Sequence, residues 1–459
     1  MSSLDLARDV EEVQRADRTT IAPMAGARQA PAAARTPNDG AGRSSLTLKL
    51  RGLRAVVAVL DHGGVGRAAN VLCLSQPAVT RSLSDLESEL GFALFERTAR
   101  GMIATHAGRI LCARARRALA ELARGCSAAI GADSRSQLDE RASLRFAAMV
   151  GPQSLLSLLA IADLGSGLRA GDYLGRSQPT IHRHLVDLEH LVGVALFQRS
   201  SKGTRLTEAG VALLKSVKLA LSEIASASDE LAAFGGHLIG KVTVAGLPLS
   251  SGFLLPRALG RLLERHGDLQ VTVVDGTYDA LVQQLRCADI DMIIGALRLD
   301  SAPPDIVQEI LFEDALSVIA RPGHPCLAGG SKNLEELTRH PWLVPLPNTP
   351  ARAAFERAFR QAGVRCPEAQ LQVNSPSVVR TLLLESDRLA LLSALQVDAE
   401  LRAGQLVRVP LQLGDLSRTL GVACRREGIL SPGSAALVEE LRGLAAELRG
   451  DQRLTSRRH

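Results

Sequence analysis

Residues 67–111 read RAANVLCLSQPAVTRSLSDLESELGFALFERTARGMIATHAGRIL, and residues 169–213 read RAGDYLGRSQPTIHRHLVDLEHLVGVALFQRSSKGTRLTEAGVAL. The two stretches align without a gap at a constant offset of 102, and roughly half of their positions are identical. A repeat of this length and fidelity indicates a duplicated domain. We call the two occurrences copy one and copy two.

Each copy has the pattern of a helix-turn-helix. In copy one, the apolar residues 53–60 predict a helix that ends at Gly63 and Gly64, because glycine readily adopts the left-handed cap. A short second helix is expected over residues 67–72. Ser75 is then placed to cap a third helix, and Pro77 falls in its first turn, where a missing N–H costs little.

This third helix is predicted to have an apolar face and a polar face. The apolar residues recur at three- and four-residue spacing: Val79, Leu83, Leu86 and Leu90. The polar residues are suited to base edges and phosphates: Gln76, Thr80, Arg81 and Ser84. Residues 95–105, with Arg97, Arg100 and Gly101, predict a basic two-stranded wing, and Thr105 is expected to cap a helix that runs to about Ile130.

In these residues the chain resembles the LysR-type transcriptional regulators. Matching features are the Ser-Gln-Pro start of the recognition helix, the Leu-Glu pair and the Gly-x-x-Leu-Phe-x-Arg turn into the wing. The turn occurs twice, first as Gly91, Leu94, Phe95 and Arg97, and again as Gly193, Leu196, Phe197 and Arg199. The resemblance implies that the third helix of each copy reads the major groove of double-stranded DNA. The alternative is a repeated helical unit that binds nothing.

The motif gives a set of expected DNA contacts. In copy one they are Gln76, Thr80, Arg81, Arg97 and Arg100; in copy two they are Gln178, His182, Arg183, Arg199 and Lys202. Thr80 and Ser82 are replaced by His182 and His184, so the two copies are not expected to read identical bases. A solvated helix face is the competing interpretation of Arg81.

Charge is unevenly distributed. The net charge of the 459-residue chain is +6. Residues 46–125 hold twelve Lys and Arg against six Asp and Glu, residues 155–234 hold eight of each, and residues 240–450 hold twenty-two against twenty-four. Because phosphate neutralisation dominates DNA affinity, copy one is predicted to bind DNA strongly and copy two weakly.

Composition excludes several classes of protein. The chain is 46% apolar and 22% charged, as in ordinary globular proteins, and its length predicts three or four domains. Aromatic residues make up only 3%, which argues against stacking on single-stranded nucleic acid. No apolar run is long enough to span a membrane, and the first residues lack a signal-peptide core, so we expect a cytoplasmic protein.

No catalytic, metal or cofactor site is predicted. The sequence lacks a Gly-x-Ser-x-Gly elbow and a P-loop, so an enzyme is not expected. Its seven cysteines are far apart and follow no metal-binding spacing. Inert reduced thiols are the expected state in a cytosol, and a peroxide-sensing pair, as in one branch of the family, is the alternative.

We predict the following domains: a disordered tail (1–45), a winged helix-turn-helix with its following helix (46–130), a connector (131–150), a second winged helix-turn-helix with a long helix (151–236), an effector-binding domain (240–450) and a tail (451–459). Residues 142–150 are apolar and are expected to pack against copy two. The resemblance implies that the long helix of copy two pairs with its twin from another subunit, giving a homodimer or homotetramer. Its apolar residues have the spacing required: Leu213, Leu214, Val217, Leu221 and Ile224.

After Lys241 strands and helices alternate, which predicts an α/β domain with a largely parallel sheet. Strands are expected over 241–245, 269–274, 290–295, 342–345, 369–373, 389–392 and 406–410, with helices over 252–264, 280–286, 351–362 and 377–385. This half resembles the LysR effector domain, itself similar to periplasmic solute-binding proteins. The matching residues are Leu254-Leu255-Pro256, ADIDMIIG at 288–295 and RPGHP at 321–325.

That likeness implies two lobes around a cleft for a small-molecule effector. Ser250 and Ser251 are expected to begin the first helix of one lobe, and Ser375 and Ser377 the facing helix of the other. Helix N-termini suit a carboxylate or hydroxylated effector, and Arg298 would add charge. Plain N-capping explains each serine equally well. The resemblance is nearest to the branch that governs sugar-binding-protein and aromatic-acid genes, which points to a sugar or an aromatic acid.

The predicted fold class is therefore multidomain α plus α/β, with two winged helix-turn-helix domains before a two-lobed periplasmic-binding-protein-like effector domain. The predicted function is effector-controlled, sequence-specific DNA binding. The alternative is a cytoplasmic solute-binding or sensor protein whose helical modules do not bind DNA.

Overall fold

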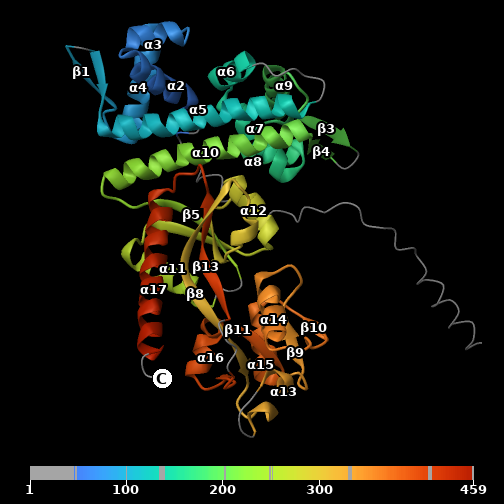
Figure 1. Cartoon of the computed structure of the whole chain (residues 1–459). Helices are drawn as coiled ribbons and strands as arrows, with labels where there is room; N and C mark the ends of the chain where they lie inside the picture. Colours follow the sequence, from blue (N-terminus) through green and yellow to red (C-terminus); the bar gives the residue numbers. More distant parts are fainter. Residues whose placement is uncertain are drawn as a thin grey trace, which may run out of the picture. The chain divides into compact units, whose positions relative to one another are not determined.

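The structure is a computed structural model that describes residues 46, 49–99, 101–133, 140–200, 203–247, 250, 252–328, 333–411 and 416–456 (Figure 1). The predicted N-terminal tail, residues 1–45, therefore lies outside the described residues, as do Arg100, Lys202 and Ser251. At the other end, helix α17 (Pro432–Ser456) continues past residue 450, where the effector domain was predicted to end.

The duplication holds element by element. Copy one comprises α2 (Leu50–His62), α3 (Val65–Val71), α4 (Gln76–Leu90), β1 (Phe95–Thr98), β2 (Gly101–Ala104) and α5 (His106–Ala132). Copy two comprises α7 (Pro152–Leu164), α8 (Gly167–Leu174), α9 (Gln178–Val192), β3 (Phe197–Ser200), β4 (Gly203–Leu206) and α10 (Glu208–Phe234). Every element of copy two starts 102 residues after its counterpart.

The predicted helix signals are confirmed. Gly63 and Gly165 end the first helices in the left-handed conformation, with φ of 69° and 67°. Thr105 and Thr207 cap the long helices, each accepting a hydrogen bond from the backbone N–H of the third residue on, at 3.0 Å. Ser75 occupies the N-cap of α4, but its hydroxyl makes no capping hydrogen bond; the equivalent Ser177 does cap α9.

The connector contains a helix, α6 (Glu140–Met149). Its Phe146 is fully buried, together with Ala147 and Val150, in a core shared with both copies. The Arg54 guanidinium of α2 donates to the carbonyl oxygens of Ala147 and Val150 at 2.9 and 2.7 Å. The apolar residues at 142–150 therefore pack against copy one as well as copy two.

The C-terminal half contains the predicted two lobes. In the first lobe, β5 (Gly240–Gly246) pairs in parallel with β6 (Leu269–Val274) and β7 (Met292–Ala296), and α11 (Leu254–Arg265), α12 (Tyr278–Arg286) and α17 complete it. In the second, β9 (Trp342–Val344) pairs in parallel with β10 (Leu371–Gln372) and β11 (Leu389–Ser393). Its helices are α13 (Leu334–Leu337), α14 (Pro350–Gln361), α15 (Pro376–Glu385) and α16 (Asp398–Arg402).

Two long antiparallel strands connect the lobes, and the sequence did not predict them. β8 (Ile306–Ala320) pairs with β13 (Ser417–Arg425), and the two join the first lobe's β7 to the second lobe's β11, while β12 (Val407–Arg408) pairs with β8. The sheet is thus parallel within each lobe and antiparallel between the lobes, which corrects the expectation of a largely parallel sheet.

Each lobe has its own apolar core on both faces of the sheet. In the first lobe, Leu255 and Leu262 of α11 pack with Leu437 and Leu441 of α17. In the second, Trp342 packs edge-on against Phe355 and Phe359, with ring centroids 5.5 and 5.3 Å apart.

Among the described residues, no single helix is long and apolar enough to cross a membrane. Helices α6 and α7 together reach that length and composition, but with a 99° bend between them.

Candidate nucleic-acid interface

The recognition helix of copy one is oriented by its apolar side. Val79, Leu83 and Leu86 of α4 are buried. Leu86 lies directly against Gly52 of α2, where a Cβ atom would come within 2.6 Å of its side chain. Glycine at 52 therefore lets α2 and α4 approach closely, and this leaves the other side of α4 exposed. That side carries Gln76, Thr80 and Arg81, as predicted.

Copy two orients α9 in the same way. Ile181, Leu185 and Leu188 are buried, and Gln178, His182 and Arg183 are exposed. His184 differs, because its ring turns inward and its Nδ1 lies 2.9 Å from the Ser157 hydroxyl of α7. Burial lowers the pKa of His184, and the ring packs against α7 instead of joining the reading face. The two reading faces therefore differ where Thr80 of copy one is replaced by His182 of copy two. The replacement of Ser82 by His184 does not change the reading face.

The wings form as predicted. β1 pairs antiparallel with β2 and β3 with β4, in matching registers. Each wing is hydrogen-bonded to the end of the first helix of its copy: the Met102 N–H donates to Gly63 O and the Thr204 N–H to Gly165 O. Arg97 is exposed on β1; Arg199 lies on β3, and its side chain is not among those described.

The Leu-Glu pair of the motif has a structural role that sequence reasoning did not identify. The Glu87 carboxylate accepts a hydrogen bond from the Leu94 N–H at 2.7 Å, and Glu189 accepts one from the Leu196 N–H at 2.8 Å. Each carboxylate thereby fixes the turn between recognition helix and wing. The sequence signal for this structural role was the recurrence of the Leu-Glu pair in both copies.

The excess positive charge of copy one does not lie on its reading face. Arg114 is 2% exposed and paired with Glu223 and Glu230 of α10, and Arg117 is paired with Glu223. Arg116 is paired with Asp61, Arg124 with Glu121, and Arg54 with backbone carbonyls. Among the side chains that the structure describes, the exposed arginines of the two helix-turn-helix regions are equal in number: Arg51, Arg67, Arg81 and Arg97 in copy one, and Arg169, Arg176, Arg183 and Arg205 in copy two. Because Arg114 and Arg117 of copy one are paired with Glu223 and Glu230 of copy two, these cross-copy pairs reduce the charge difference that predicted weak binding by copy two.

The predicted effector residues differ in burial and in their position relative to the helix starts. Ser250 is fully buried, with its hydroxyl 2.9 Å from Leu247 O and 2.8 Å from Ile294 O, and α11 begins four residues later at Leu254. The expectation that Ser250 begins this helix is wrong, because the intervening turn is held inside the fold by that hydroxyl. Ser375 is the N-cap of α15, and its hydroxyl lies 3.1 Å from that of the exposed Ser377.

Arg298 follows β7, as predicted. Its guanidinium lies over the Tyr278 ring, 3.9 Å from the centroid, and its backbone N–H and C=O both bond the Gln308 amide. The buried Tyr278 hydroxyl has no hydrogen-bond partner among the described residues. The two lobes touch where Gly252 lies against the backbone of Gln396.

Comparison with known proteins matches both halves of the chain. Residues 50–109 and 152–211 each match the bacterial regulatory helix-turn-helix protein, LysR family, and residues 235–446 match the LysR substrate binding domain. The HTH-type transcriptional regulator GalR of Pseudomonas putida is 33% identical over 395 residues, covering 86% of this chain and 97% of that protein. The HTH-type transcriptional regulator PcaQ of Agrobacterium fabrum is 26% identical over 294 residues, covering 64% of this chain and 94% of that protein.

Among solved structures, full-length CbnR complexed with its target DNA is similar at 23% identity and a TM-score of 0.48, covering 63% of this chain and 98% of that one. The chain belongs to the LysR family of DNA-binding, effector-responsive transcriptional regulators, and it carries the family's helix-turn-helix twice.

Proposed function

We propose that both copies contact operator DNA, through the exposed faces of α4 and α9. The observation that carries this proposal is the matched presentation of Gln76 and Arg81 on one helix and Gln178 and Arg183 on the other. Glutamine and arginine make the bidentate contacts that discriminate adenine and guanine in the major groove. Arg97, Arg100, Arg199 and Lys202 are proposed to hold phosphates beside the groove. The exposed arginines of copy two favour a comparable electrostatic contribution, in place of the weak one expected from net charge.

Separate substitutions of the two recognition arginines test this proposal. Arg81→Ala and Arg183→Ala should each weaken operator affinity by about 1–3 kcal/mol at fixed salt, as loss of a base contact does. Arg124→Ala is the matched control, because it removes one positive charge from an exposed position on α5 that lies off the reading faces. Fluorescence anisotropy with a promoter duplex gives the affinities. Equal affinities for Arg183→Ala and Arg124→Ala would remove copy two from the interface.

We also propose that a small hydroxylated or carboxylate effector, such as a sugar or an aromatic acid, binds between the two lobes. The candidate contacts are Arg298, the Ser375 and Ser377 hydroxyls and, beyond the described residues, Ser251. Ser250 fits an indirect role better, because its hydroxyl is already engaged with two carbonyl oxygens. A thermal-shift screen of sugars and aromatic acids would identify the effector. Arg298→Ala and Ser375→Ala should then reduce its stabilising shift, whereas Arg265→Ala, on the outer side of α11 paired with Glu440, should not.

We infer that the protein acts in the cytoplasm as a regulator and not as an enzyme. The family assignment supports this view, since the relatives are named as HTH-type transcriptional regulators.

A further inference from the structure

The long helices of the two copies pair with each other inside one chain. α5 and α10 run antiparallel: His106 lies against Phe234, with ring centroids 4.8 Å apart, Arg117 binds Glu223, and a Cβ atom at Gly125 would lie 2.5 Å from that of Ser216. Residue numbers thus rise along one helix as they fall along the other. The two helices lie side by side over their length (Figure 1).

This pairing covers the face of α10 that the sequence assigned to another subunit. Leu213, Val217 and Ile224 are each at most 1% exposed within the single chain, and the other two residues predicted for this face, Leu214 and Leu221, are partly buried against the same core. They belong to one core with the buried residues of α5, which are Leu111, Cys112, Ala115, Ala118, Leu122, Cys126, Ala129 and Ile130. The expected contact with a twin helix from a second subunit is therefore replaced by a contact with the chain's own duplicate.

Antiparallel pairing of two equivalent helices implies approximate twofold symmetry. Since α10 repeats α5 at an offset of 102, the axis passes near Leu119 and Leu221, which are equivalent residues at the middle of the pair. Each winged helix-turn-helix packs on the N-terminal part of its own long helix, as the contacts of Gly108 with Leu94 O and of Gly210 with Leu196 O show. The two DNA-binding copies therefore lie at opposite ends of the α5/α10 pair.

The length of the pair suits double-stranded DNA. Each long helix has 27 residues, which at a rise of 1.5 Å per residue is about 40 Å. Successive major-groove segments on one side of B-DNA are about 34–36 Å apart.

We propose that a single chain is a built-in pair of DNA-binding domains that holds two successive major-groove segments, α4 on one and α9 on the other. The inference rests on the DNA contacts proposed above, and it adds how α4 and α9 are arranged along the DNA. Because Thr80 and His182 differ at the reading faces, the two segments have different sequences. The operator is thus recognised as two unequal half-sites by one polypeptide.

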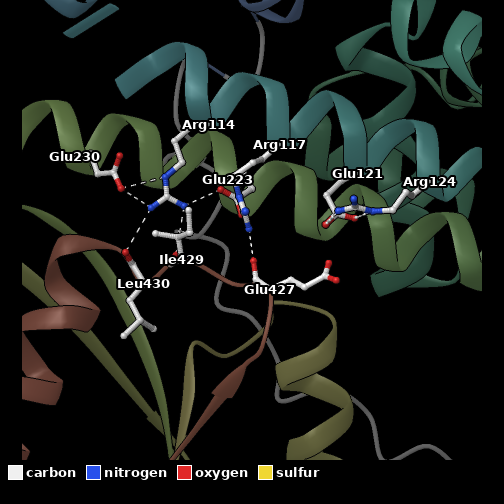
Figure 2. A network of polar contacts seen from close by, with 9 residues as sticks. All are labelled: Arg114, Arg117, Glu121, Arg124, Glu223, Glu230, Glu427, Ile429 and Leu430. Atoms are coloured by element: carbon white, nitrogen blue, oxygen red, sulfur yellow. Dashed lines mark hydrogen bonds and ion pairs between the residues drawn. The ribbon is translucent and has the colours of Figure 1, made fainter. Parts of the chain in front are cut away.

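A polar network shows how one effector domain is attached to this pair (Figure 2). The Arg114 guanidinium of α5 binds Glu223 at 2.7 Å and Glu230 of α10, and it also donates to Ile429 O and Leu430 O, at 3.3 and 3.4 Å, in the loop between β13 and α17. Arg117 adds a bond to Glu427 O. These contacts join both long helices to the effector domain.

The network exists on only one side of the approximate axis. The residue equivalent to Arg114 is Ser216, which packs against Gly125, and the residue equivalent to Glu230 is Ala128. The symmetry-related position therefore lacks both the cation and one of its carboxylates. One chain thus carries two recognition helices and a single effector domain, which is attached on one side of the pair.

Stoichiometry on DNA tests the proposal with the full-length protein. Native mass spectrometry gives the number of chains per operator duplex, and footprinting gives the number of protected groove segments. We expect two segments per chain, with Arg81→Ala exposing one segment and Arg183→Ala the other at unchanged stoichiometry. One segment per chain, with both variants weakening the same segment, would overturn the built-in pair while leaving DNA binding intact. If the unmodified protein did not bind the operator specifically, the result would instead contradict the proposed DNA contacts themselves.

A second measurement separates pairing within one chain from pairing between chains. Glu121 of α5 and Lys215 of α10 line the same groove, so a carbodiimide can join the carboxylate to the amine. In a refolded mixture of ¹⁴N- and ¹⁵N-labelled protein, the cross-linked peptides should be purely light or purely heavy. Cross-linked peptides that combine a light and a heavy half would show that α5 of one chain pairs with α10 of another. They would refute the pairing of α5 and α10 within one chain. Lys215→Arg keeps the charge, lacks the reactive amine and should abolish this cross-link.

Discussion

Arg114 holds three separate parts of the chain together with one side chain. Its guanidinium is 2% exposed, and it faces Glu223, Glu230 and two carbonyl oxygens. Burial alone would lower its pKa, but the hydrogen bonds that it donates to Glu230 and Glu223 raise the pKa, so the group is charged at any relevant pH. Removing one partner of a buried ion pair leaves the other charge uncompensated, which is more damaging than losing a surface pair.

Arg114→Leu should therefore lower the free energy of unfolding by about 3 kcal/mol. Arg124→Leu is the matched control, because Arg124 pairs with Glu121 on the same helix but is 57% exposed; its loss should cost less than about 1 kcal/mol. Urea denaturation followed by circular dichroism measures both. Adding Glu223→Gln and Glu230→Gln to Arg114→Leu should restore part of the loss. Equal effects of the two arginine substitutions would contradict the buried-pair argument.

Asp229, near the end of α10, should make stability depend on pH. Burial and the nearby Asp291 raise the pKa of Asp229 from 3.8 to about 6. The folded state then holds this proton more tightly than the unfolded state does, so the contribution of Asp229 to stability decreases as pH rises from about 4 to 6. We expect Asp229→Asn to be more stable than the unmodified protein at pH 7.5 and to lose less stability over this range.

The control for this titration has the opposite sign. Arg286 hydrogen-bonds Asp305 and lowers the pKa of that carboxyl, so its stabilising contribution is present above the unfolded pKa and is lost as pH falls. Asp305→Asn should therefore be less stable than the unmodified protein at pH 7.5. Denaturation midpoints at pH 4.5 and 7.5 distinguish the two variants, and a destabilised Asp229→Asn at pH 7.5 would reject the assignment.

At the scale of elements, two equivalent glycines mark the contact of each long helix with its wing turn. A Cβ atom at Gly108 would overlap Leu94 O, and one at Gly210 would overlap Leu196 O. Because backbone atoms cannot move aside cheaply, Gly108→Ala and Gly210→Ala should each cost about 1–3 kcal/mol, as overpacking does. Gly260→Ala in α11 has open space around it and should stabilise by about 0.5–1 kcal/mol. Thermal unfolding midpoints provide the comparison, and a neutral Gly108→Ala would show that the helix can shift away from the turn.

Local patterns predicted the elements that depend on local information. The helix-turn-helix boundaries fell within a few residues of the observed ones, because glycine caps, Thr105 and the spacing of Val79, Leu83 and Leu86 act within one or two helical turns. β8 and β13 were missed because they are defined by pairing with each other over about a hundred residues of sequence. The exposed reading face was predictable from its contrast with the apolar face. The inward hydroxyl of Ser250 and the internal pairing of Arg114 were not, since both depend on residues distant in sequence.

At the scale of the whole molecule, duplication changes what the long helix pairs with. In a chain with one helix-turn-helix, the apolar face of α10 would be uncovered and would require a second subunit. Here α5 covers it, and other surfaces of the chain remain for any association between full-length copies. The internal ion pairs follow from the same arrangement, since arginines of copy one neutralise glutamates of copy two and leave the reading faces similarly charged.

Removal of copy one should therefore convert the protein into a form that pairs between subunits. Deleting residues 1–139 removes α5 and uncovers Leu213, Val217 and Ile224 on α10. We expect the truncated chain to dimerise through these residues and to bind DNA through two α9 helices, with reduced affinity and a footprint shorter than that of full-length assemblies. Light scattering and footprinting measure the two effects. Val217→Glu in the truncated chain should abolish the dimer, because a carboxylate cannot be buried there without a partner. A folded truncated chain that stays monomeric at micromolar concentration, or that protects the full-length footprint, would show that α5 does not stand in for a second subunit.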